Sequence, residues 1–407
     1  MLCDYYYAKC AKGTAIRKMS ALSRKLKNEK GESAIIDLTL GNPLLPPPEV
    51  YQKALEIVSQ NTDCMRHGYS TTLGDTPARQ AMADIISSFE KVLSSAENVV
   101  LTPGCTAAIN VFLRSVLNPR DEVILFSPYF LEYPFYIDNC QATMKIVRTK
   151  FEENWQPNAK MLEESLTEKT KVIIINSPNN PTGVVYTEET MVKIVEVLKR
   201  YNTTHNHKIW ILNDSVYRRL IEGDTFTLFD KYQYSAIAYS LSKDVSIPGE
   251  RVGCIAVNPL LDTCQEFVAG IANFNEILGF MQPNRLHQFV LPIMELAVAD
   301  LKQYVTSREI ICECLEDLGI KFVKPHGAFY FFPKIEEGNE EEFCHLFAMN
   351  GVVVVPGSAF GECGYFRMSI CQPPEIVRGW VEQFKECYRK TVHQLKEKTS
   401  AEHTIVH

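Results

Sequence analysis

The sequence predicts an α/β fold with two domains: a large one built on a mixed, mostly parallel, seven-stranded sheet, and a smaller α+β domain. Between residues 98 and 258, seven short apolar runs alternate with amphipathic helical segments. Such near-continuous apolar strands are typical of a sheet that helices cover on both faces. The pattern then changes to long helices and ends with three short strands. The 407 residues are enough for two domains.

The expected elements follow one another in a clear order. Residues 1–35 are polar and rich in lysine after the tyrosines, and we expect an arm or a helix there. Helical periodicity covers residues 49–60 and 76–92. Long helices are expected over residues 264–316, interrupted by two prolines, and a polar helix over residues 374–398. The expected strands are NVVLT, EVILF, TMKIV, KVIIIN, KIWIL, AIAYS and CIAVN, and later those within KFVKPHGAFYFFP, VVVVPG and YFRMSI.

The composition excludes several classes of protein. Hydrophobic residues make up 46% of the chain and charged ones 22%, as in soluble globular proteins. The net charge of -7 argues against nucleic acid as a partner, because no basic excess offsets phosphate repulsion. The 13 cysteines show no metal-ligand spacing and predict reduced, mostly buried thiols. No run is long and apolar enough for a membrane span or a signal peptide, so we expect a cytoplasmic protein.

The stretch YSLSKDVSIPGERVG, between two apolar runs, contains the strongest candidate for chemistry. Lys243 lies there between Ser240 and Ser242, with Arg251 further on. Burial lowers the pKa of a lysine and makes its amine a nucleophile towards carbonyl carbon. The serines and the arginine would suit a phosphate. Together they suggest a Schiff base with pyridoxal phosphate, although a polar surface loop is the commoner explanation of such a string when it is taken alone.

Two further strand ends carry polar side chains that would suit the same cofactor. Asp214 follows the run KIWIL, and a carboxylate there would keep a pyridine nitrogen protonated. Tyr217 could bond the phenolic oxygen of the ring. Asn180, in SPNNPTG, would project from the carboxyl end of a strand, where ligands lie in open α/β sheets. Read alone, Asp214 is also explained as a helix cap and Asn180 as part of a tight turn.

An anion site and a stacking residue are expected beside these groups. Gly104 breaks a strand before an alanine-rich helix that begins near Thr106, and the amides of such a helix start attract anions. Aromatic residues in SPYFLEYP follow the next strand. They would stack on a flat cofactor or belong to the core.

Eight motifs follow one another along the chain: GNP at 41–43, Tyr69 in a Y-x(4)-G context, Gly104-Cys105-Thr106, Pro128-Tyr129-Phe130, the NNPTG turn, Asp214 with Tyr217, S-x-S-K with Arg251, and Arg367 in YFRMSI. In these motifs and in their order, the chain resembles the class I/II aminotransferase family of fold-type I pyridoxal-phosphate enzymes over nearly its whole length. It is most similar to bacterial aspartate-aminotransferase-like members.

This resemblance implies a role for each matching residue. Lys243 would form the Schiff base and shuttle the proton, while Asp214 would pair with the ring nitrogen. Phe130 would stack on the ring, with Tyr129 as a rival. Tyr69 would reach the phosphate of a neighbouring subunit, which implies a homodimer. Asn180 and Tyr217 would bind the phenolic oxygen of the cofactor. Its phosphate would be bound by Gly104, Cys105, Thr106, Ser240, Ser242 and Arg251. The substrate would be bound by Gly41, Asn180 and Arg367.

The resemblance also implies a function and a domain division. We expect an aminotransferase that moves the amino group of an aspartate-like or aromatic L-α-amino acid to a 2-oxo acid. Another pyridoxal-phosphate reaction on the same fold, such as that of a C–S lyase, decarboxylase or oxidase, is the alternative. Residues 1–45 would form an arm that joins the small domain, residues 46–285 the large cofactor-binding domain, and residues 286–407 the small domain. No second arginine for a distal carboxylate is evident, which leaves dicarboxylate specificity open.

Overall fold

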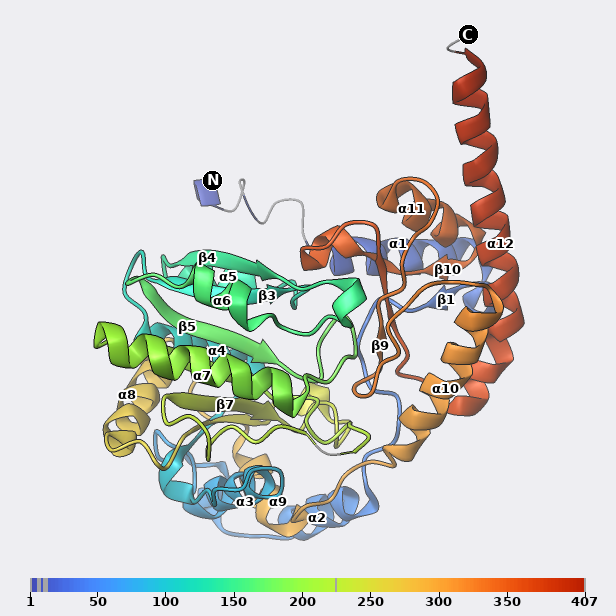
Figure 1. Cartoon of the computed structure of the whole chain (residues 1–407). Coiled ribbons are helices and arrows are strands. Elements are labelled where there is room, and N and C mark those ends of the chain that lie inside the picture. Colours follow the sequence, from blue (N-terminus) through green and yellow to red (C-terminus); the bar gives the residue numbers. More distant parts are fainter. Residues whose placement is uncertain (1, 6–8, 10–13, 224, 406–407) are drawn as a thin grey trace.

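The computed structural model describes residues 2–5, 9, 14–223 and 225–405 (Figure 1). Within these residues, seven strands form one large sheet in the order β2-β8-β7-β6-β5-β3-β4. Strand β8 is antiparallel to both of its neighbours, whereas all other pairs of adjacent strands in this sheet are parallel. This confirms the predicted mixed, mostly parallel sheet. The strands are β2 (Val99–Thr102), β3 (Glu122–Ser127), β4 (Thr143–Arg148), β5 (Thr170–Asn176), β6 (Trp210–Asp214), β7 (Ser235–Ser240) and β8 (Gly253–Val257).

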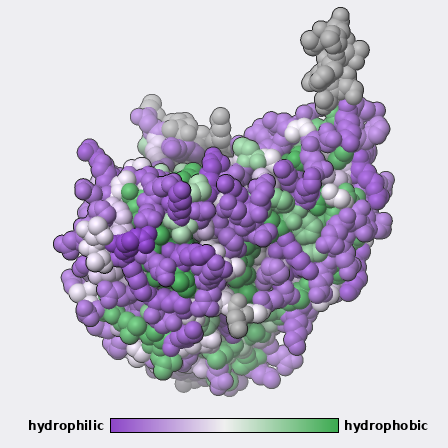
Figure 2. Space-filling model, viewed as in Figure 1, coloured by the Kyte–Doolittle hydropathy of each residue, from purple (hydrophilic) through white to green (hydrophobic). Residues whose placement is uncertain are grey.

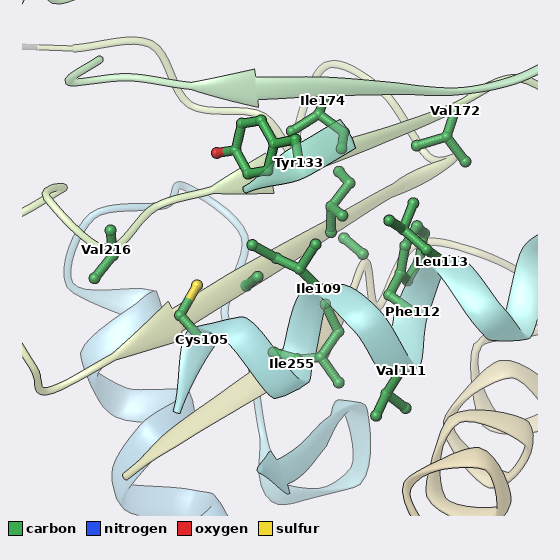
Figure 3. Close-up of a cluster of buried hydrophobic side chains, with 14 of the residues drawn as sticks. Cys105, Ile109, Val111, Phe112, Leu113, Tyr133, Val172, Ile174, Val216 and Ile255 are labelled. Carbon is green, nitrogen blue, oxygen red and sulfur yellow. The ribbon is translucent and has the colours of Figure 1, made fainter. Parts of the chain in front are cut away.

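The apolar strand residues point alternately to the two faces of this sheet, and each face is covered by helices. Val172 and Ile174 of β5 belong to the core beneath helix α4 (Cys105–Val116), as Figure 3 shows. Ile173, between them, packs on the opposite side with helix α7 (Glu188–His205). Because a strand that is buried on both faces needs apolar residues at every position, the unbroken apolar runs predicted these strands correctly.

The remaining helices of the larger part complete these layers. Helix α8 joins α4 on one face, and α6 joins α7 on the other. A third apolar cluster lies between the β2, β8 and β7 strands and helices α2, α3 and α9. The bounds of these helices are α2 (Glu49–Ser59), α3 (Thr76–Ser87), α5 (Tyr133–Asn139), α6 (Ala159–Ser165), α8 (Cys264–Ile277) and α9 (Arg285–Met294).

The smaller part has its own core and includes the N-terminal segment. Strand β1 pairs in parallel with β10, and three short strands form an antiparallel sheet in the order β11-β12-β9. A separate apolar cluster lies between these strands and helices α10, α11 and α12. The domain limits at residues 45 and 285 remain a prediction. The bounds here are α1 (Ala15–Lys30), β1 (Ile36–Asp37), α10 (Lys302–Asp317), β9 (Tyr330–Phe331), α11 (Glu340–Asn350), β10 (Val352–Val353), β11 (Val355–Pro356), β12 (Phe366–Ser369) and α12 (Pro374–Ile405).

Two helices end elsewhere than the periodicity predicts, and Pro292 lies within helix α9 instead of interrupting the helices as expected. Helix α3 stops at Ser87, although the pattern extends to residue 92. The reason is tertiary: Glu90 is buried, and its carboxylate accepts the amides of Leu228 and Phe229 at 2.8 and 3.0 Å. Helix α12 continues to Ile405, past the expected end near residue 398.

The surface and the thiols agree with the composition. The face shown in Figure 2 is mostly hydrophilic, with smaller apolar patches. Twelve cysteines of the described chain are free thiols, and nine of them are buried. In the same residues, no helix is long and apolar enough to cross a membrane, and no cluster of side chains could hold a metal ion.

Candidate active site

A cavity of about 220 Å³ lies at the carboxyl ends of the central strands. Asn176 ends β5, Asp214 ends β6 and Ser240 ends β7, and all three line this cavity. Parallel strands bring their carboxyl ends to one edge, which is where open α/β sheets bind ligands. The predicted site residues in its lining are Gly41, Cys105, Thr106, Phe130, Asn180, Asp214, Tyr217, Ser240, Ser242, Lys243, Arg251 and Arg367.

Lys243 follows strand β7, and its amine faces the cavity. Its Nζ donates a hydrogen bond to the carbonyl oxygen of Gly41 at 2.5 Å and lies 5.8 Å from the centre of the Phe329 ring. Loss of hydration lowers the pKa of Lys243 to about 8, and the nearby arginines Arg367 and Arg251 act in the same direction. About a tenth of this amine is therefore uncharged at pH 7, far more than for an ordinary lysine, and able to act as a nucleophile or base.

Asp214 is a buried carboxylate with several hydrogen-bond donors. The Tyr133 hydroxyl donates to Oδ2 at 2.7 Å, and the Cys105 thiol to Oδ1 at 3.4 Å. Burial raises the pKa of Asp214, whereas these donors oppose the rise. A helix cap does not explain Asp214, because no helix begins in the described residues between β6 and β7. The carboxylate is thus held at the cavity wall, available to a cationic group of a ligand.

The start of helix α4 and Arg251 lie together where the sequence predicts an anion site. Gly104 precedes the helix with φ 89°, and a Cβ atom there would lie 2.5 Å from Nη2 of Arg251. Arg251 itself has φ 56° and donates to the carbonyl oxygen of Pro248 at 2.8 Å. The hydroxyls of Ser240 and Ser242 are 3.1 Å apart nearby in the lining. Amides at a helix start, hydroxyls and a guanidinium are the donors that a phosphate requires.

Arg367 is a buried cation without an acidic partner in the described chain. It is only 1% exposed, and no carboxylate lies within ion-pair distance among these residues. Its guanidinium donates to Asn180 Oδ1 at 3.3 Å and to the carbonyl oxygen of Thr39, and it lies over the Tyr330 and Phe360 rings. Its Nε has no hydrogen-bond partner. A buried cation of this kind is poised for an anionic ligand.

Three lining residues or neighbours were missed by the reading of the sequence. Asn176 bridges two predicted residues, because its Nδ2 donates to the Asp214 carbonyl and its Oδ1 accepts the Asn180 amide. Tyr133 donates to Asp214, and Tyr330 lines the cavity. Asn176 is the last residue of an apolar run, and this position could have indicated a site residue. The two tyrosines lie in aromatic-rich stretches, which favour an interpretation as core residues.

The structure also distinguishes the two aromatic candidates and places Tyr69. Phe130 lines the cavity, whereas Tyr129 packs beneath the backbone of Gly361 and donates its amide to the Phe360 carbonyl at 3.0 Å. Tyr69 is outside the cavity lining of this single chain, and it is 93% exposed. Within one chain the structure therefore brings twelve of the predicted residues together in the lining, with Gly104 beside Arg251, whereas Tyr69 lies apart.

Comparison with known proteins identifies the class to which this fold and cavity belong. Residues 33–382 match the family described as Aminotransferase class I and II. The chain belongs to this family and is an aminotransferase. The family and fold that the sequence predicted are thereby confirmed.

Individual relatives make the comparison more specific. The chain is 34% identical over 364 residues to an aspartate aminotransferase of Thermotoga maritima. The matched region covers 87% of this chain and 92% of the relative. The crystal structure of an aminotransferase from Eubacterium rectale matches with a TM-score of 0.89 and 29% identity, over 96% of this chain and 99% of that one. The crystal structure of the Thermotoga maritima aspartate aminotransferase matches with a TM-score of 0.82 and 27% identity, over 92% and 96%.

Proposed function

We propose that this aminotransferase uses pyridoxal phosphate, bound through Lys243, to transfer the amino group of an L-α-amino acid to a 2-oxo acid. The observation that carries the proposal is the set of charges around one cavity: three cations, Lys243, Arg251 and Arg367, and one buried carboxylate, Asp214. A phosphate, an aldehyde, a carboxylate and a pyridinium nitrogen are the four groups that this set would bind.

The residues present fit pyridoxal phosphate in size and chemistry. Arg251, Ser240, Ser242 and the start of helix α4 would hold the phosphate, and the hydroxyl of Tyr217 would reach the phenolic oxygen. Only two of the five N–H groups of the buried Arg367 are bonded within the described part of the chain, and its Nε has no partner there, so donors remain for a forked contact with the substrate carboxylate. When bound, the cofactor supplies an aldehyde that accepts the amino group and a ring that withdraws electrons from the α-carbon.

Lys243 would both hold the cofactor and carry the proton during the reaction. Its pKa of about 8 leaves an uncharged amine available near neutral pH. A base whose pKa lies near the working pH is efficient at proton transfer. The carbonyl of Gly41 accepts a hydrogen bond from Nζ and so fixes the direction of the amine. The amine would take the proton from the α-carbon of the substrate and deliver it to the cofactor carbon that carries the amino group.

Asp214 and Arg367 would orient and stabilise rather than react. Asp214, with Tyr133 and Cys105 as donors, presents a fixed negative charge to the ring nitrogen. Arg367 would pair with the substrate α-carboxylate, and Asn180 would hold the guanidinium in place. A positioned ion pair of this kind aligns the α-carbon with the base. Exclusion of water by the aromatic rings around Arg367 would strengthen the pair.

For the substrate, we propose an aspartate-like or aromatic amino acid. The support comes from relatives, because several that are 27–34% identical to this chain are named as aspartate or aspartate/prephenate aminotransferases. Another pyridoxal-phosphate reaction on the same fold is the alternative. The two are separated by measuring whether each keto acid formed is matched by a new amino acid, or whether ammonia, carbon dioxide or hydrogen peroxide is released instead.

We also propose a homodimer that shares its active sites and works in the cytoplasm. Tyr69, which is 93% exposed, would complete the phosphate site of the other subunit. Gln288 bonds both Ser70 and the carbonyl of Pro283, which links the Tyr69 loop to the segment that carries the exposed apolar residues Phe280 and Met281. An exposed apolar surface of this kind favours association. The twelve free cysteines support a reducing compartment.

One experiment tests the core of this proposal. The purified protein should take up pyridoxal phosphate and become coloured, and borohydride should fix the cofactor to Lys243, as shown by peptide mapping. Lys243→Ala should still bind the cofactor but lose turnover. Labelling of another lysine, or no uptake at all, would reject the proposal. Sedimentation analysis of the same sample tests the dimer independently.

A further inference from the structure

We propose that Tyr330 is a positioning residue of the active site: its hydroxyl orients Tyr217, and its ring supports Arg367. The inference rests on the proposed function, since it assigns a role within the same cavity. Tyr330 is 2% exposed and lines that cavity. Two groups on which the proposed chemistry depends are in contact with this one side chain.

The hydroxyl of Tyr330 lies 2.8 Å from the hydroxyl of Tyr217. Tyr217 follows strand β6 of the large sheet, whereas Tyr330 begins β9 in the smaller part, so the contact joins the two parts at the cavity. Burial raises the pKa of both phenols, which keeps both protonated at neutral pH. When Tyr330 donates to Tyr217, the proton of Tyr217 is free to point at an acceptor in the cavity.

Gly41 fixes the Tyr330 hydroxyl from the other side. A Cβ atom at residue 41 would lie only 2.1 Å from the Tyr330 oxygen, so the hydroxyl occupies the space that any larger residue would fill. The Gly41 carbonyl also accepts the hydrogen bond from Lys243. The phenol is therefore held between the backbone that orients the lysine and the hydroxyl that would orient the cofactor.

The ring of Tyr330 serves a second purpose. The Arg367 guanidinium lies 5.1 Å from the ring centre, and strand β9, which begins with Tyr330, pairs with β12, which carries Arg367. The face of an aromatic ring attracts a cation without neutralising it. Arg367 is thus stabilised in the apolar interior while its charge stays available for a carboxylate. Loss of the Tyr330 hydroxyl should therefore affect the absorption spectrum and kcat, whereas loss of its ring should affect KM.

Tyr330→Phe removes the hydroxyl and keeps the ring. The holoenzyme should show its pH-dependent change of absorption at a pH higher by about 0.5–1 unit, because Tyr217 becomes a weaker donor to the phenolic oxygen. We expect kcat to fall roughly 3- to 10-fold, the equivalent of one lost hydrogen bond, with little change in KM for the amino acid. Tyr330→Leu also removes the ring and should in addition raise KM.

A double-mutant cycle shows whether Tyr330 acts through Tyr217. In the Tyr217→Phe background, Tyr330→Phe should shift the absorption change by less than about 0.2 pH units, since the partner hydroxyl is gone. Tyr232→Phe is the matched control. That tyrosine is buried and donates to the Ile209 carbonyl at 2.6 Å, but it lies outside the cavity lining. It should lower stability without moving the spectrum.

Distinct outcomes separate this inference from the proposed function. An unshifted spectrum in Tyr330→Phe, or an equal shift in both backgrounds, would overturn the role of Tyr330 while leaving the function intact. Failure of the wild type to bind the cofactor at Lys243 would instead reject the function itself. If Tyr330→Phe does not fold, fluorotyrosine at position 330 keeps the shape and makes the phenol a stronger donor. The absorption change should then move to lower pH, and no movement would overturn the inference.

Discussion

At the scale of single residues, the active site is a set of buried charges whose partners are incomplete within the chain. Arg367 has aromatic and neutral polar neighbours, and Asp214 has a phenol and a thiol. Burying an unpaired charge costs several kcal/mol, so such groups persist where a ligand supplies the missing partner. The chemistry of the ligand can therefore be inferred from what each residue lacks.

Replacing Asp214 by asparagine should lower kcat by at least ~10²-fold, because the shape is kept but the charge that would hold a pyridinium proton is lost. Steady-state kinetics on the cofactor-loaded protein measures this effect. Asp230→Asn, at an exposed carboxylate, is the control and should leave kcat unchanged. Turnover close to that of the wild type in Asp214→Asn would show that this carboxylate is only structural.

Replacing Arg367 by lysine keeps the charge but loses the forked geometry. We expect kcat/KM for amino acids to fall roughly 30- to 1000-fold, which corresponds to ~2–4 kcal/mol for a desolvated forked pair. Reaction with simple amines, which have no carboxylate, should be spared. Arg200→Lys is the matched control, because Arg200 is 56% exposed on helix α7 and pairs with Glu163 at the surface. A parallel loss for both kinds of substrate would mean that Arg367 has no carboxylate to bind.

At the scale of elements, the junction between strand β2 and helix α4 sets the geometry of the anion site. Gly104 adopts φ 89°, which side chains disfavour, and this turn aims the first amides of α4 at the cavity. The absence of a Cβ lets Arg251 approach the same backbone. A single glycine thus brings together the helix start and the guanidinium.

Gly104→Ala should weaken cofactor binding by 10-fold or more and lower the stability of the protein by roughly 1–3 kcal/mol, because the new Cβ would strain the turn and displace Arg251. Fluorescence titration of the cofactor-free protein and thermal unfolding measure the two effects. Gly270→Ala is the matched control: it lies within helix α8 with no atom within 4 Å of the added Cβ. It should leave binding intact and stabilise slightly. Equal binding by both variants would contradict this account of the turn.

At the scale of the whole molecule, the two parts meet around the cavity. Burial of Lys243 there costs stability, because its ammonium group loses hydration. The pKa of Lys243 falls to about 8 through loss of hydration, whereas it is about 10.4 in an unfolded chain. Between these two values the unfolded chain holds more protons than the folded one. The contribution of Lys243 to stability therefore rises as the pH increases through this window.

Lys243→Gln should remove this dependence in the cofactor-free protein. Relative to the variant, the wild type should gain roughly 2 kcal/mol of unfolding free energy between pH 7 and about 10.5, after allowance for hydration of the open cavity. Denaturant unfolding across this pH range measures the free energy of unfolding of both proteins. The contributions of all other titrating groups cancel when the variant is subtracted from the wild type. Lys53→Gln, at a 69% exposed lysine, should run parallel to the wild type. Parallel curves for Lys243→Gln as well would show that its amine is not destabilised by burial.

Local sequence was sufficient to predict the main elements. The seven apolar runs became β2 to β8. In all of them except the partly exposed edge strand β4, burial on both faces of the sheet demands apolar residues at successive positions. Lys243, Asp214 and Asn180 could be chosen because each follows a strand of the large sheet, and the ends of parallel strands meet at one edge. Arg367, which lies within β12 of the smaller part, could be chosen only through the resemblance to the family. The family followed from the order of these motifs, and the match to residues 33–382 confirms it.

Contacts between residues far apart in the chain could be decided only by the tertiary structure. The early end of helix α3 depends on Glu90 reaching the amides of residues 228 and 229. The approach of Tyr330 to Tyr217, 113 residues away, brings the smaller part onto the cavity. Periodicity reports only which face of an element is buried, not which distant side chain meets it there. The sequence thus determined the strands and the candidate reactive residues, and tertiary packing determined the side chains that contact them.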